Sequence, residues 1–123
     1  TLSYATGPSG VYLEKLFERW GIAEQIKPRT VVPPPGTPVG ALVASGQVAL
    51  GFQQLSELIS VQGLDVVGNL PSDVAYITTF SSGIPVAVAQ DAARQQAVQQ
   101  FLQFLASAEV EAVKRQQGMS WSA

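Results

Sequence analysis

The chain has 123 residues, the length of one domain, and 46% of them are hydrophobic, so it can bury a core. Only 13% are charged, the net charge is −2, and the seven Lys and Arg residues are scattered, which argues against a nucleic-acid-binding protein. Because there is no Cys and no His, the ligands of zinc and haem sites are missing, and we expect no metal site and no cofactor.

The first half of the chain alternates strand-like and helical segments. In the first helical segment, Leu13, Leu16, Phe17 and Trp20 recur at helical spacing and Gly21 follows as a stop signal. The predicted strands are residues 2–5, 30–32 and 48–52, and the predicted helices are residues 9–20, 23–26 and 39–44. Strands that alternate with helices form a mainly parallel sheet flanked by helices, so the predicted fold class is α/β.

The second half is predicted to contain one more strand-like stretch and two helices at its end. After a short helix at residues 56–59 and apolar residues at 65–67, residues 74–89 are strand-like, and Pro85 indicates an edge or a bend there. Asp91 is a candidate cap for a long helix, and another helix is predicted from Ser107 to Gly118.

Two turns, residues 7–10 and 35–38, each follow a strand-like run and each precede a helix. A helix N-terminus presents unpaired backbone N–H groups and about half a positive charge, so it can bind an anion without Lys or Arg. Neither turn contains a charged residue. We therefore predict that the two helix starts face one cleft and hold a small anion, although Gly, Pro and Ser are also typical of turns that only cap a helix.

Several stretches together resemble a known family. They are residues 3–10, 11–22, 39–46, 48–52, 101–105, 108–109 and 118–119. In these stretches the chain resembles the later half of a periplasmic solute-binding protein of ABC importers, of the molybdate-binding type, with the type II binding-protein fold. The resemblance implies a clamp of two lobes. Residues 1–75 would be the second ligand-binding lobe, and residues 76–123 a crossover strand and terminal helices that pack on a first lobe outside this sequence.

The resemblance also implies ligand-binding positions. In the family, backbone N–H groups at helix starts and a few hydroxyls hold the ligand. The first donor falls at Ser9 and the second at Pro38, which has no N–H, so the donor would shift to Thr37 or Val39. A tyrosine of the molybdate binders aligns with Gln54, and an amide there suits a carboxylate or another organic ligand. The expected ligand-binding residues are Thr6, Gly7, Ser9, Gly10, Thr37, Val39, Gln53 and Gln54.

The implied function is the binding of a molybdate-like oxyanion or an organic acid, for delivery to the membrane subunits of an ABC importer. The implied location is the periplasm, with a signal peptide upstream of Thr1. Two alternatives stay open on the same architecture: an isomerase of small polycarboxylates and the effector-sensing domain of a transcription regulator. We expect no enzyme, because the sequence has no His, no Cys, no Gly-x-Ser-x-Gly motif and no pair of acids that converges on the predicted cleft.

The two terminal helices carry apolar residues that would pack on the first lobe, which lies outside this sequence. Without a covering lobe, these residues would leave an exposed apolar patch, which predicts self-association or exchange of the terminal helices between chains. They are Phe101, Phe104, Leu105, Val110, Val113 and Trp121.

Overall fold

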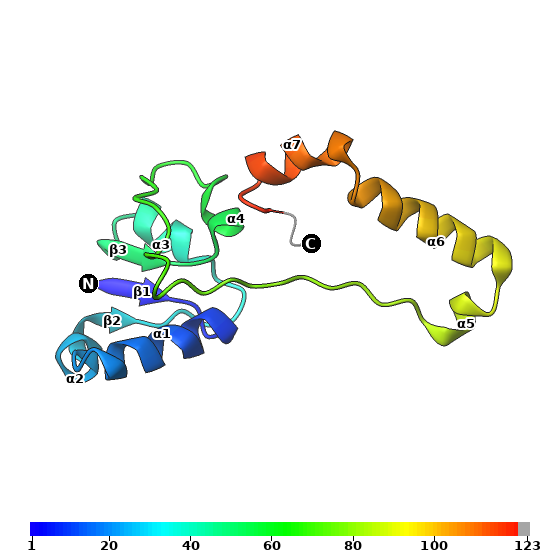
Figure 1. Ribbon diagram of the computed structural model, residues 1–123. Coiled ribbons are helices and arrows are strands. Elements are labelled where there is room, and N and C mark those ends of the chain that lie inside the picture. Colours follow the sequence, from blue (N-terminus) through cyan, green and yellow to red (C-terminus); the bar gives the residue numbers. More distant parts are fainter. Residues whose placement is uncertain (121–123) are drawn as a thin grey trace. The chain divides into compact units, whose positions relative to one another are not determined.

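The computed structural model describes residues 1–120 and contains two compact units, Thr1–Thr78 and Thr79–Ala123 (Figure 1). The first unit holds all three strands of the described chain. Its elements are β1 (Leu2–Tyr4), α1 (Pro8–Arg19), α2 (Ala23–Ile26), the 3-10 helix η1 (Lys27–Arg29), β2 (Thr30–Val31), α3 (Val39–Ala44), β3 (Leu50–Phe52) and α4 (Leu55–Leu58). The assignment of residues 1–75 and 76–123 to particular lobes stays a prediction.

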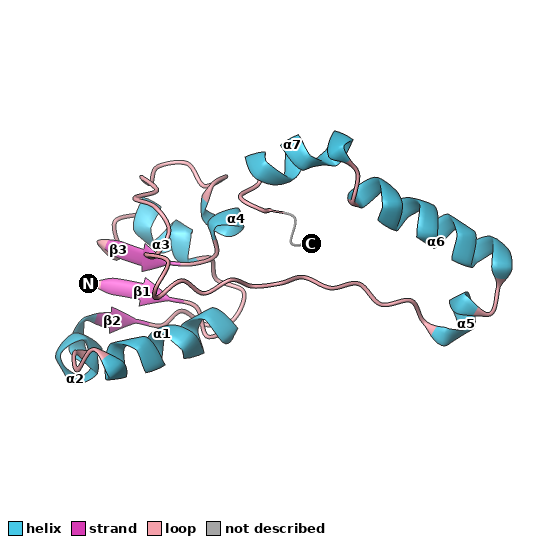
Figure 2. Ribbon diagram, in the orientation of Figure 1, coloured by secondary structure: helices cyan, strands magenta, loops and turns pink. Residues whose placement is uncertain are grey.

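The three strands form one parallel sheet in the order β2-β1-β3 (Figure 2). The central strand β1 aligns Leu2 with Thr30 of β2 and with Leu50 of β3. Ser3 is fully buried in this strand, and its hydroxyl donates to the Val31 carbonyl oxygen at 2.6 Å, so no polar group is left unpaired there. The predicted α/β class is confirmed, and the architecture is consistent with a single lobe of a binding-protein fold.

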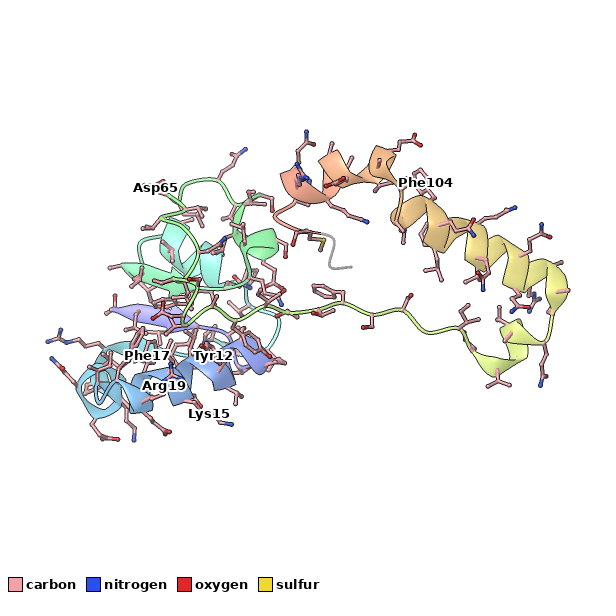
Figure 3. All side chains as sticks on the ribbon, in the orientation of Figure 1. Tyr12, Lys15, Phe17, Arg19, Asp65 and Phe104 are labelled. Carbon is pink, nitrogen blue, oxygen red and sulfur yellow. The ribbon has the colours of Figure 1, made fainter. Side chains whose placement is uncertain are left out.

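The core of the first unit lies between α1 and the sheet. It contains Tyr4, Leu13, Leu16, Phe17 and Val74, and Phe17 packs its ring against Tyr4 and Phe52 with centroid distances of 6.0 Å each. Figure 3 shows Phe17 on the sheet side of α1, whereas Lys15 points away from the sheet. The predicted apolar face of the helix is therefore confirmed at Leu13, Leu16 and Phe17.

Two predictions are wrong at the ends of their elements: the place of Trp20 on the apolar face of the first helix and the length of the strand at 48–52. Trp20 is 48% exposed, because α1 ends at Arg19 and Trp20 is already the capping residue beyond the packed face. The strand predicted over residues 48–52 is shorter, and Leu50 is 45% exposed. The physical reason is that β3 is an edge strand in the described part of the chain, with a neighbouring strand on one side only.

The strand-like residues 65–67 and 74–89 do not form strands. Residues 86–89 are instead helical (α5, Val86–Ala89), with Pro85 as the N-cap, and Val67 and Ile77 are 90% and 83% exposed. A β-branched composition favours an extended backbone, but a strand also needs a neighbouring backbone for its ladder of hydrogen bonds. Within residues 1–120, the segment at 75–84 has no such ladder partner.

The second unit consists of α5 and two longer helices, α6 (Ala92–Leu105) and α7 (Ala108–Gln116). The predicted cap is confirmed, because the Asp91 carboxylate accepts a hydrogen bond from the Arg94 N–H at 3.1 Å. Phe101, Phe104 and Val113 are 59%, 48% and 53% exposed. Leu105 and Val110 are half-buried, and Trp121 lies outside the described residues. Within the described part of the chain, no helix combines the length and apolarity needed to span a bilayer.

Candidate functional site

The parallel sheet brings most of the predicted ligand-binding residues to one edge. Tyr4 and Phe52 are paired at the carboxyl ends of β1 and β3. The turn at 6–10 follows β1, and Gln53 and Gln54 follow β3, so both groups lie beyond the same edge of adjacent strands. Figure 1 shows α1 beginning beyond the tip of β1. In open α/β sheets, ligands bind at this carboxyl edge.

The start of α1 leaves one backbone donor free. Gly7 is the N-cap, Pro8 has no N–H, and the N–H groups of Gly10 and Val11 both donate to the Gly7 carbonyl at 2.9 and 3.2 Å. The Ser9 N–H has no acceptor among the described residues. Since the first turn of α1 contains no acidic side chain, the partial positive charge of the helix start is not offset there.

Gly10 has a packing role that its place in the turn does not reveal. A Cβ atom on Gly10 would lie 1.7 Å from the Ala5 carbonyl oxygen and 2.9 Å from the Ala5 carbonyl carbon. Only glycine therefore allows the α1 backbone to approach the end of β1 this closely. Gly7 has no such neighbour within 4 Å, and Thr6 is exposed.

One backbone N–H at the start of α3 is bound by a side chain from the segment that follows β3. The Gly40 N–H donates to the Gln53 side-chain oxygen at 3.3 Å, and Ala41 donates to the Pro38 carbonyl. The Thr37 N–H donates to the Pro34 carbonyl at 3.1 Å, so a turn already uses this amide. The Val39 N–H has no acceptor in the described chain, and the residue is fully buried.

The Gln53 contact fixes the orientation of its amide group. With its oxygen toward Gly40, the side-chain NH₂ is left as a hydrogen-bond donor without a partner among the described residues. Gln54 is the N-cap of α4 and makes no capping bond with its side chain. Both glutamines are half-buried at the carboxyl edge, where an amide can donate to an oxygen-rich ligand.

Sequence reasoning missed a cavity of about 410 Å³ between α1, α2 and β2. None of the predicted ligand-binding residues lines it. Inside it, the Tyr4 hydroxyl donates to a Glu14 carboxylate oxygen at 3.4 Å, and Glu18 and Glu24 also lie on its wall. Burial, together with the charge and hydrogen bond of Glu14, raises the pKa of Tyr4 above its ordinary value. The wall carries three carboxylates against the single positive charge of Lys27, which makes this cavity a poor site for an anion.

The described residues contain no group of three or more Asp and Glu side chains placed to hold a metal ion. The donors at the carboxyl edge of the sheet are neutral backbone and side-chain amides. Within the described chain, the accessible free groups of this edge are the Ser9 N–H and the Gln53 amide nitrogen, from segments that follow β1 and β3, whereas the unpaired Val39 N–H after β2 belongs to a fully buried residue.

Comparison with known proteins is consistent with this architecture. Residues 1–120 match the family model described as bacterial extracellular solute-binding protein. The chain is also 43% identical over 110 residues to an aconitate isomerase from a Pseudomonas species, over 87% of this chain and 39% of the relative. No solved structure matches the chain. Because the alignment covers 39% of the aconitate isomerase, the chain spans well under half the length of that relative. Since the family model covers nearly all of the sequence, the chain belongs to the bacterial extracellular solute-binding protein family.

Proposed function

We propose that the protein carrying this chain binds a small organic acid with several carboxylates. The observation that carries the choice of ligand is the 43% identity to a relative whose name specifies aconitate, a tricarboxylic acid. Membership of the solute-binding family supports the binding of a small solute. We further propose that binding takes place in the periplasm and that the solute passes to the membrane subunits of an ABC importer.

The chemistry of the candidate site supports a carboxylate ligand. A carboxylate oxygen accepts hydrogen bonds from backbone N–H groups at a helix start, and the Ser9 N–H is free in that position. The Gln53 amide nitrogen offers a further neutral donor at the same sheet edge. A molybdate-like oxyanion is the competing ligand for the same groups. The presence of Gln54 where molybdate binders have a tyrosine favours the organic acid.

A thermal-shift titration of the protein that carries this chain tests the proposal. The panel holds trans-aconitate, cis-aconitate, citrate, molybdate, tungstate and sulfate. A ligand that binds only the folded state stabilises it by about 2.7 kcal/mol at a concentration of 100 Kd, so Tm rises with the concentration of a true ligand. We expect this rise with a tricarboxylate. A rise with molybdate alone refutes the organic acid, and no rise with any anion refutes anion binding altogether.

Matched variants of Ser9 and Gln53 locate the ligand. Ser9→Ala keeps the backbone N–H and removes the hydroxyl, so we expect the Kd to change by less than about threefold. Gln53→Glu keeps an acceptor for the Gly40 N–H but replaces the free amide donor with a negative charge, so we expect the affinity for a tricarboxylate to fall about tenfold or more. Equal affinities of wild type and Gln53→Glu would place the ligand elsewhere.

Isomerisation of a polycarboxylate is the second candidate function, and the name of the relative favours it. The described acids of α1, Glu14 and Glu18, line the separate cavity and not the carboxyl edge of the sheet. Incubation of the protein with cis-aconitate, followed by proton NMR of the vinyl signal, distinguishes the two functions. A binding protein leaves the isomer ratio equal to that of a heat-denatured control, whereas turnover establishes an enzyme.

A further inference from the structure

Tyr12 joins the start of α1 to the segment at 74–76, close to the end of the first unit. Its hydroxyl donates to the Val74 carbonyl oxygen at 2.8 Å, across 62 residues of sequence. Its ring stacks on the Tyr76 ring with a centroid distance of 4.8 Å and an interplanar angle of 18°. Figure 3 shows Tyr12 on the side of α1 that faces the sheet. One side chain therefore holds this segment through two separate contacts.

The part of this segment that packs on the first unit ends at Tyr76. Val74 is only 7% exposed, belongs to the core, and closes a turn through its N–H to the Pro71 carbonyl at 3.0 Å. Tyr76 is 44% exposed, and the next residue, Ile77, is 83% exposed. The backbone of residues 75–84 makes no hydrogen bond within the described chain. Among the described residues, the Tyr12–Tyr76 stack is thus the last ring contact or hydrogen bond before the exposed stretch that begins at Ile77.

We propose that the Tyr12–Tyr76 pair is a latch that determines where the connection between the two units becomes free to move. With the latch closed, pivoting of the connection begins at Ile77. When it is open, the segment can detach back to Val74, whose side chain remains in the core. The latch lies one helical turn from Ser9, so it attaches the connection to the same helix start that carries the free N–H group. The proposal does not depend on the identity of the ligand.

Two features make this pair suitable for a latch. A tyrosine has two side-chain torsions, so ordering it costs less conformational entropy than ordering a long flexible side chain. The Tyr12 hydroxyl bond sets the ring direction, and the stack then sets the position of Tyr76. Tyr12 itself is held, because it also packs against the core of the first unit. The contacts are few, so opening does not require the core of the unit to unfold.

Amide hydrogen exchange of the full chain tests the latch. Tyr76→Ala removes the stack, and Tyr12→Phe keeps the ring but removes the hydroxyl bond to Val74. Each is expected to raise the exchange rate of the Val74 amide, which donates to the Pro71 carbonyl, about three- to tenfold, as the loss of one such contact implies. Ile77→Ala is the matched control, because it truncates the adjacent exposed side chain, and its effect should stay below about twofold.

Two results would overturn the proposal. In the first, the Val74 amide exchanges in Tyr76→Ala and Tyr12→Phe at the same rate as in Ile77→Ala. In the second, they accelerate exchange equally throughout β1 and α1, which indicates a loss of general stability. Chymotrypsin gives an independent measurement in Tyr12→Phe: cleavage after Tyr76 should rise relative to cleavage after Phe80, which is 70% exposed in the closed state. An unchanged cleavage ratio contradicts the latch.

Discussion

Substitution of Gly10 by alanine is the sharpest test of how the turn after β1 is built. In an isolated helix, Gly→Ala is stabilising by about 1 kcal/mol, because alanine has the higher helix propensity. In this structure, the new Cβ would lie 1.7 Å from the Ala5 carbonyl oxygen, whereas ordinary van der Waals contact begins at 3.4 Å. The sign of the effect therefore distinguishes a helix position without close neighbours from a position of close backbone approach.

The expected magnitude follows from the atoms involved. Both neighbours of the new Cβ belong to the Ala5 backbone, so no side chain can rotate away. The start of α1 must move by roughly 1.5 Å to restore contact distances, and Leu13, Leu16 and Phe17 move with it. Overpacking of this kind costs about 1–3 kcal/mol, and we expect the upper end after the gain in helix propensity is subtracted. For a unit of this size, the Tm would fall by about 10–20 °C.

Urea unfolding followed by circular dichroism measures this change, with Gly7→Ala as the matched control. Gly7 has no atom within 4 Å of its Cβ position, and its φ of −74° and ψ of −170° are accessible to alanine. We expect Gly7→Ala to change the free energy of unfolding by less than about 1 kcal/mol. A close approach of the α1 backbone to Ala5 is refuted if Gly10→Ala is as stable as Gly7→Ala, or more stable than the wild type.

Further predictions concern single interactions. Gln53→Ala removes the acceptor of the Gly40 N–H, so urea unfolding should show a loss of about 1 kcal/mol, and an unchanged midpoint would contradict the contact. Asp91→Ala removes the cap of α6, and helicity of the second unit should fall, with a loss of about 0.5–2 kcal/mol. The raised pKa of Tyr4 favours its protonated form in the folded state, so this contribution is complete below about pH 10 and is lost as the pH rises further; a stability profile that rises there would refute it. If exposed apolar side chains of the terminal helices cause self-association, Phe104→Glu should lower the mass measured by light scattering, and identical masses would refute this.

Sequence patterns predicted the elements whose causes lie within a few residues. The bounds of α1 follow from Pro8 at its start and Gly21 after its end, where φ is +72°. The cap of α6 by Asp91 depends on atoms three residues apart. The α/β class likewise follows from the alternation of short strands and helices, because this order admits few arrangements other than a parallel sheet.

The candidate site could be predicted only in part. The free Ser9 N–H follows from local features, since Pro8 lacks an N–H and its neighbours bond back to Gly7. The bond between the Gln53 side chain and the Gly40 N–H could not be foreseen, because it joins the end of one strand to a helix that precedes it in the chain. The predicted ligand contacts themselves stay predictions.

The sequence by itself determined where most helices begin and end, since turns, caps and helical periodicity depend on short-range sterics and hydrogen bonds. Only the tertiary structure decided which β-branched segments became strands. Thr30–Val31 pairs with β1, whereas the similar residues at 65–67 and 74–85 remain outside the sheet. The physical reason is that a strand is completed by a neighbouring backbone distant in sequence. Likewise, the need for glycine at position 10 arises from the Ala5 carbonyl pressed against it, a contact that the geometry of packing sets.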